Sequence, residues 1–450
     1  MDDFEFVTET IKKKPINKKR IGLKILFNIA MGVLFGIVAC LIFVLVEPKL
    51  YAKMYPEKPN LISIPKDEIE ENPEEISTDE ENVTNVALNT APEEENAVSE
   101  TLSEKEETTD SSSGAVVNQI IREKEITLDD YKSLYRQIGT VAAEASRSLA
   151  LVTAVSNETD WFMNTYETGN QTTGIILADN GKELLIIANS NNISSAKDID
   201  VKFCNGKSYK GTVKKSDSDT GLTVVAVNLE DIDDNTKNSM AMATLGNSSL
   251  ANLTGTPVMA LGSPLGISDS MAMGSITSNK HIFDITDSNL RYITTDIYGS
   301  TSGSGVIIDL EGKVLGIIFQ GGTSNDTKNL IHAYAISDIK SKIEKLSNGQ
   351  DLAYLGIKGT DVTDEINEEL GVPKGAYVTQ VTVDSPAMKE GIQNGDVIIK
   401  LGTNEINSFK DYKDAMLKCQ PGDLMMVTVK RLSKDGYIEL SYEIVLGTKP

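Results

Sequence analysis

Short apolar runs alternate with polar turns over most of the chain beyond residue 126. Turn-forming groups such as Asp179-Asn180-Gly181 separate the runs between Ser148 and Val227. A second set of similar runs extends from Val258 to Ile336. Short strands at regular spacing, separated by such turn residues, are typical of all-β barrels and sandwiches. The pattern therefore predicts a mainly β fold, with its first strand at Ser148 to Val155.

Helical spacing of apolar residues interrupts this strand pattern. Between Leu128 and Leu149 apolar residues recur at three- and four-residue intervals, which indicates a helix. Two shorter helices are expected at Ser337 to Leu346 and at Phe409 to Leu417. The first of these would close the second set of strands.

The longest apolar run lies near the N-terminus. Ile25 to Val46 comprises 22 residues, enough for a helix to cross a bilayer core of about 30 Å. Basic residues precede this run and Glu47 follows it. Because positive charge favours the cytoplasmic side, the sequence predicts a cytoplasmic N-terminus and extracytoplasmic folded domains.

We interpret residues 1–20 as a basic cytoplasmic tail and residues 21–46 as a transmembrane signal anchor in the cell membrane. A cleaved signal peptide is the alternative. It is less favoured because Glu47-Pro48-Lys49 offers no cleavage site of small residues. The expected protein is thus single-pass, with the lipid bilayer as one partner.

Charge distinguishes the next segment. From Asp67 to Asp110 there are 17 acidic residues, one lysine and no aromatic residue. Such a segment cannot bury enough apolar surface to fold, so residues 47–125 are expected to be a disordered acidic linker, with a specific acidic docking site as the alternative. The net charge of −23 argues against nucleic-acid binding. No disulfide framework, metal site or cofactor is expected.

A serine flanked by glycines, Gly303-Ser304-Gly305, stands ahead of an apolar strand. Together with the runs Thr173 to Leu177 and Leu261 to Gly266, it resembles the HtrA family of chymotrypsin-fold serine proteases. The resemblance implies two six-stranded β-barrels within residues 126–347 and an active-site cleft between them. It also implies Ser304 as the nucleophile position, with Ser302 as the alternative. The oxyanion hole is assigned to the N–H groups of these two serines.

The catalytic partners of that family are replaced in this chain. Asn191 occupies the position of the histidine, and Gly221 occupies that of the aspartate. An amide cannot take a proton at neutral pH. His281 is interpreted as a surface residue in a polar loop, and His332 as a structural residue of the strand Leu330 to Ile336. The sequence therefore favours a pseudoprotease, with an active endopeptidase of envelope protein quality control as the alternative.

The last segment, residues 350–448, resembles a bacterial PDZ domain. Its run Ser385-Pro386-Ala387 is followed by Gly395-Asp396-Val397-Ile398. The resemblance assigns Tyr354, Leu355, Gly356 and Ile357 to a loop that binds a peptide carboxylate.

Tyr412 and Met416 are expected to line the peptide groove, with ordinary core packing as the alternative. The expected partners are peptide C-termini or unfolded proteins. Family resemblance also implies a homotrimer, for which the helix from Leu128 is a candidate, or association with an intact homologue.

Overall fold

The computed structural model describes residues 26–40, 42, 59–67, 126–159, 165–189, 193, 196, 198–319 and 327–449. Contacts divide the chain into two compact units. They are Met1–Leu61 with Asn180–Glu183, and Ile62–Asp179 with Leu184–Pro450.

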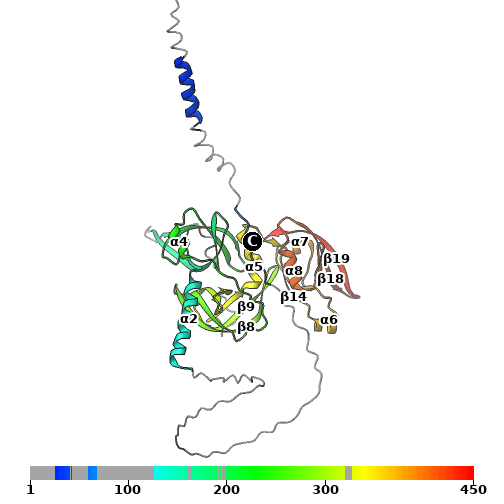
Figure 1. Cartoon of the computed structure of the whole chain (residues 1–450). Helices are drawn as coiled ribbons and strands as arrows, with labels where there is room; N and C mark the ends of the chain where they lie inside the picture. Colours follow the sequence, from blue (N-terminus) through cyan, green and yellow to red (C-terminus); the bar gives the residue numbers. More distant parts are fainter. Residues whose placement is uncertain are drawn as a thin grey trace, which may run out of the picture. The chain divides into compact units, whose positions relative to one another are not determined.

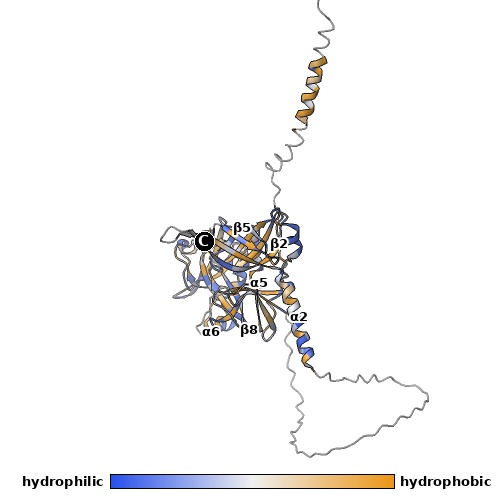
Figure 2. Cartoon of the chain, turned by 90° about the vertical axis from the view of Figure 1, so that its left-hand side faces the viewer, coloured by the Kyte–Doolittle hydropathy of each residue, from blue (hydrophilic) through white to orange (hydrophobic). Residues whose placement is uncertain are grey.

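In the first unit, residues 26–40 form an exposed helix of apolar side chains, coloured orange in Figure 2. Within the ranges just given, no helix combines the length and the apolar character needed to cross a membrane. The predicted anchor at 21–46 extends outside the described residues on both sides. Most of the predicted linker also lies outside them.

Two closed six-stranded barrels form much of the second unit (Figure 1). The strands of the first barrel pair in the order β1-β2-β3-β6-β5-β4. The pairs β1–β2, β1–β4, β2–β3, β4–β5 and β5–β6 are antiparallel. Its strands are β1 (Leu149–Thr159), β2 (Thr165–Asp179), β3 (Glu183–Asn189), β4 (Asp198–Lys202), β5 (Ser208–Asp217) and β6 (Leu222–Asn228).

The second barrel repeats this architecture with the order β10-β11-β12-β9-β8-β7. Its strands are β7 (Pro257–Ser263), β8 (Ser270–Ile285), β9 (Ser288–Tyr298), β10 (Ser304–Ile308), β11 (Val314–Phe319) and β12 (Leu330–Ala335). Every residue of β10 and of β11 is buried. Because neighbouring side chains of a strand point to opposite faces, these fully buried strands show that both faces of the sheet are covered.

Beyond the barrels, a sheet of order β14-β15-β16-β18-β19 carries the short β17 on β16, and β13 pairs with β20. These strands are β13 (Ala353–Tyr354), β14 (Ile357–Asp361), β15 (Ala376–Val381), β16 (Val397–Leu401), β17 (Asn404–Glu405), β18 (Leu424–Ser433), β19 (Gly436–Val445) and β20 (Gly447–Thr448). They have an apolar core of their own that includes Phe409 and Tyr412.

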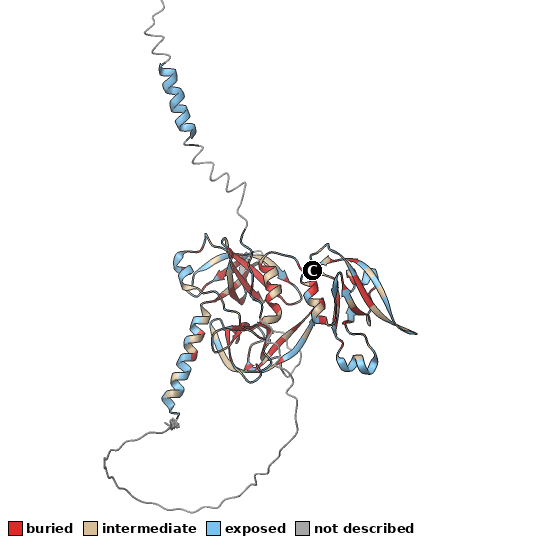
Figure 3. Ribbon diagram, turned by 45° about the vertical axis from the view of Figure 1, so that its right-hand side comes forward, coloured by how far each residue is buried: buried red, intermediate tan, exposed pale blue. Residues whose placement is uncertain are grey.

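Within the part of the second unit that the structure describes, these strands are accompanied by the helices α2 (Leu128–Ser146), α4 (Asp234–Ser239), α5 (Ile336–Ser347), α6 (Asp364–Leu370), α7 (Pro386–Glu390) and α8 (Phe409–Met416). A capping box of Thr127 and Asp130 starts α2. Leu128, Tyr131 and Leu134 in its first half are exposed. Figure 3 shows long pale-blue stretches of exposed residues along this helix. In α5, Ile339 and Ile343 are fully buried and join an apolar cluster shared by both barrels.

The two predicted barrels are confirmed, and the helices predicted in 128–149, 337–346 and 409–417 are present as α2, α5 and α8. The first helix ends at Ser146 and not at Leu149, because Leu149 already pairs with Ile175 in the barrel. Strand β8 extends to Ile285. His281 was predicted in a polar loop, which is wrong. It lies within β8 opposite Tyr292, because the β8–β9 hairpin keeps its pairing up to the turn.

Candidate functional site

Ser304 is the first residue of β10 and is 6% exposed. Its Oγ accepts a hydrogen bond of 2.9 Å from the backbone N–H of Thr173 in β2. Gly305 follows at φ 124°, and a Cβ atom there would lie 2.0 Å from the carbonyl oxygen of Leu261. Glycine is therefore required at 305 so that β10 can approach β7. The hydroxyl of Ser304 is held inside the fold by a backbone donor of the other barrel.

Ser302 has a different environment. It is exposed in the turn before β10, and its Oγ lies 3.0 Å from Ser300 Oγ. The Ser302 N–H donates to Ser300 Oγ at 3.2 Å. This N–H, assigned to the oxyanion hole from the sequence, is thus engaged within its own turn. Which of the two serines occupies the nucleophile position stays a prediction.

Gly221, which the sequence assigned to the position of the catalytic aspartate, is buried directly before β6. It adopts φ 71°, and its N–H donates to the carbonyl oxygen of Asp217 at 2.8 Å. This left-handed turn suits glycine and leaves no side chain to orient a base. Asn191, at the position of the catalytic histidine, lies outside the described residues.

The chain has two histidines, and both belong to an aromatic cluster of the second barrel. His281 stacks on Tyr292 with ring centroids 5.3 Å apart, and His332 meets the same ring edge-on at 6.0 Å. His332 Nε2 lies 3.1 Å from the carbonyl oxygen of Thr327. Its Nδ1 is buried and has no partner among the described residues. The structure therefore places both imidazoles in packing roles.

Two aspartates shortly before Gly221 form ion pairs with lysines. Asp217 Oδ2 lies 2.5 Å from Lys342 Nζ of α5, and both side chains are almost fully buried. Lys449 Nζ lies 3.5 Å from Asp217 Oδ1 and 2.9 Å from Asp219 Oδ2. Although burial opposes ionisation, these two ammonium groups hold the pKa of Asp217 below its usual value. We call Asp217, Asp219, Lys342 and Lys449 the buried ion cluster.

The predicted carboxylate-binding loop lies between β13 and β14. Gly356 adopts φ 93°, and a Cβ atom there would lie 2.1 Å from Ser385 Cβ. The side chain of Ser385 caps α7 by accepting from the N–H of Met388. Glycine is therefore needed where the loop passes this helix start.

A carboxylate already occupies this loop. Asp287, in the turn between β8 and β9, is 6% exposed. Its carboxylate accepts hydrogen bonds from the N–H groups of Leu355 at 2.8 Å, Gly356 at 2.9 Å and Ile357 at 3.1 Å. Tyr412 Oη donates to the same carboxylate at 2.8 Å. Burial raises the pKa of this carboxyl, and the four donors oppose that shift.

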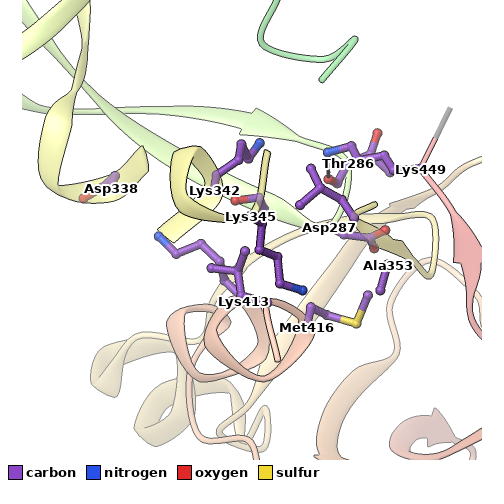
Figure 4. Close-up of a pocket in the computed structure, with 12 residues that line it drawn as sticks. Thr286, Asp287, Asp338, Lys342, Lys345, Ala353, Lys413, Met416 and Lys449 are labelled. Carbon is purple, nitrogen blue, oxygen red and sulfur yellow. Dashed lines mark hydrogen bonds between the residues drawn. The ribbon is translucent and has the colours of Figure 1, made fainter. Parts of the chain in front are cut away.

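The other predicted groove residues differ in their roles. Met416 is 4% exposed and lies with Lys413 on α8 beside a small cavity of about 30 Å³ next to the hairpin turn (Figure 4). Tyr354 pairs with Gly447 in the small two-stranded sheet and is half-buried. Tyr412 and Met416 belong to the apolar core, which is the alternative of core packing; their part in a peptide groove stays a prediction.

Sequence reasoning missed Asp287. The signal available was weak: the pair Thr286-Asp287 precedes Ser288 in an apolar hairpin, which marks a turn. Nothing local connects this turn with a loop 68 residues further along the chain.

The fold and these two sites define a class of protein, a chymotrypsin-like two-barrel domain joined to a PDZ domain. The family model for a trypsin-like peptidase domain matches residues 172–317, and that for a PDZ domain matches residues 353–441. This chain belongs to the HtrA family of serine proteases with a trypsin-like domain and a PDZ domain.

Two curated relatives illustrate the similarity. The serine protease Do-like HtrB of Bacillus subtilis is 27% identical over 282 residues, which cover 58% of this chain and 59% of that protein. The serine endoprotease DegS of Haemophilus influenzae is 26% identical over 275 residues, covering 60% of this chain and 75% of that protein. The chain thus spans less than two thirds of the Bacillus relative.

Among solved structures, an HtrA-type protease AlgW with decapeptide has a TM-score of 0.50 and 20% sequence identity. The match covers 70% of this chain and 99% of that chain. At this level of identity the likeness concerns the fold.

Proposed function

We propose that this protein is a membrane-anchored HtrA-like pseudoprotease that binds peptides or unfolded envelope proteins through its cleft and its PDZ domain. The observation that carries the proposal is Gly221, which fills the position of the catalytic acid without a side chain. The helix of residues 26–40 is part of the proposed anchor, and the folded domains would lie outside the cytoplasm.

The chemistry of the candidate nucleophile supports a loss of catalysis. A serine hydroxyl is a poor nucleophile until a base removes its proton. Ser304 Oγ accepts the Thr173 N–H, and His332 Nε2 is engaged by Thr327. Loss of triad members leaves a rate enhancement of roughly 10³–10⁴ over water, due to substrate binding and the oxyanion hole.

The geometry of the carboxylate-binding loop supports peptide binding. Three consecutive N–H groups, those of Leu355, Gly356 and Ile357, converge on one carboxylate. Backbone loops of this kind capture peptide C-termini, while the peptide adds to the neighbouring sheet edge. Strand β14 and helix α8 would flank such a peptide.

Labelling of the full chain with a fluorophosphonate probe tests the proposal. We expect no labelling, and no cleavage of unfolded casein above the background of a Ser304→Ala variant. Labelling that is abolished by Ser304→Ala or by Ser302→Ala would overturn the pseudoprotease and identify the nucleophile.

The second candidate function is an active serine endopeptidase of envelope protein quality control. The exposed hydroxyl of Ser302, in a turn just before a buried strand, favours this alternative. The relatives named above are described as proteases. The labelling experiment separates the two functions, because only an activated hydroxyl reacts with the probe.

A further inference from the structure

Asp287 reproduces the contacts that a peptide C-terminus makes with a PDZ domain. Its carboxylate receives the three loop N–H groups and the hydroxyl of Tyr412. Its own backbone N–H donates to the carbonyl oxygen of Ile357, the first residue of β14, at 2.7 Å. A bound peptide uses the same two features, a carboxylate in the loop and a backbone hydrogen bond to the sheet edge.

The hairpin presents this residue in a fixed conformation. Asp287 adopts φ 58°, a left-handed conformation that Asp and Asn tolerate better than most residues. The preceding residue is anchored on both of its backbone groups. The N–H of Thr286 donates to Asp219 Oδ2 at 3.2 Å, and its carbonyl oxygen accepts from Lys449 Nζ at 3.0 Å.

A further contact holds the other side of the turn. Lys413 Nζ of α8 donates to the carbonyl oxygen of Asn289 at 3.3 Å. The close-up of the cavity shows Thr286 and Asp287 beside Lys449, with Lys413 and Met416 nearby (Figure 4). The turn that carries the Asp287 carboxylate is thus held by hydrogen bonds on both sides of this residue.

We propose that Asp287 is a built-in ligand of the PDZ groove, which a partner bearing a free, apolar C-terminus must displace in order to bind. The inference rests on the proposed function, because it assigns the partner and the regulation of the same groove. One carboxylate fills the loop, and the loop has no second set of three N–H groups to offer. Binding of an external C-terminus and docking of Asp287 therefore exclude each other.

Competition of this kind weakens apparent affinity. When the binding-competent state is only a fraction of the population, the apparent dissociation constant rises by the inverse of that fraction. Removing the internal carboxylate should consequently tighten peptide binding. Asp287→Asn is the suitable variant, because asparagine tolerates the same left-handed backbone but lacks the charge.

The experiment measures binding of a fluorescent decapeptide with a C-terminal valine to the full chain by anisotropy. The peptide is used as a free acid and as an amide. The proteins are the unmodified chain, Asp287→Asn, Asp287→Ala and the control Asp269→Asn. Asp269 is exposed and adopts φ 59°, so the control removes a carboxylate from a similar backbone conformation outside the groove. Thermal melting monitored by circular dichroism verifies that each variant is folded.

We expect both Asp287 variants to bind the free acid about 10-fold more tightly than the unmodified chain, or better. Asp269→Asn should bind like the unmodified chain, and the amide should bind poorly throughout. Equal affinity of all four proteins for the free acid, with the amide still rejected, would overturn the internal ligand and leave the proposed peptide groove intact. Failure of every protein to distinguish acid from amide would overturn both.

Discussion

The backbone N–H of Thr173 donates to Ser304 Oγ across 2.9 Å in a buried hydrogen bond between the two barrels. Thr173 belongs to β2 and Ser304 to β10, so the bond joins segments 131 residues apart. Thr173 Oγ1 lies 3.0 Å from Ser263 Oγ, and Ser263 is the register partner of Ser304. The serine that sequence marks as the nucleophile position is therefore part of a buried hydroxyl network.

This network predicts a structural role for Ser304. Ser304→Ala should leave the Thr173 N–H buried without an acceptor, at a cost of about 1–3 kcal/mol in the free energy of unfolding. Urea denaturation of the full chain measures the loss. Ser302→Ala, in the exposed turn, should change stability little. Equal stability of the two variants would contradict the structural role.

The buried ion cluster should be costly to break. Lys342→Met would leave the Asp217 carboxylate buried beside Lys449 alone, and breaking such a pair typically costs about 3–5 kcal/mol. The matched control is Lys207→Met, because Lys207 forms a pair of similar length with Asp233 on the surface, where an ion pair contributes little. Urea denaturation at neutral pH compares the two. A Lys342 variant as stable as the Lys207 variant would refute the role of the cluster.

Acid should weaken the same cluster. Because the folded-state pKa of Asp217 is depressed, its contribution to stability is complete above the ordinary pKa of about 3.9 and is lost as pH falls towards the folded value. Replacement by Asp217→Asn should therefore flatten the pH dependence of the melting temperature below about pH 4. An unchanged pH profile in this variant would count against the assignment.

His332 should destabilise the fold as it protonates. Burial lowers its pKa below the usual value of about 6.5. The unfolded chain thus takes up the proton first, and stability should fall as pH drops below that value. His332→Phe keeps the ring contacts with Tyr292 and should weaken this dependence between pH 7 and 5, whereas His281→Phe, at an exposed position, should retain it. Thermal melting across this pH range measures the dependence. The same pH dependence in both variants would contradict the role of His332.

Local sequence was sufficient for much of the fold. Turn residues such as Asn180-Gly181 and the apolar alternation predicted the barrel strands, and the pattern in 337–346 and 409–417 predicted α5 and α8. These elements follow from neighbouring residues because apolar periodicity and turn geometry are set within a few residues.

The carboxylate-binding loop was predictable for a similar reason. Its three donors come from Leu355, Gly356 and Ile357, which are consecutive in the chain. The assignment of Gly221 to the position of the catalytic acid likewise rests on a single position and stays a prediction. Residue identity alone establishes that no carboxylate is present there.

Tertiary structure decided what these groups contact. Asp287 reaches a loop 68 residues away, and Lys342 pairs with Asp217 across 125 residues of sequence. A turn aspartate and a helical lysine have no local signature that names their partners, because the free energy of each contact depends on burial and on donors brought in by other elements. The sequence by itself predicted a carboxylate-binding loop at Leu355 to Ile357 and placed Gly221, which has no side chain, at the position of the catalytic acid. Only the packed structure decided that the carboxylate of Asp287 occupies the loop. It also decided that the hydroxyl of Ser304 accepts a hydrogen bond from Thr173 of the other barrel.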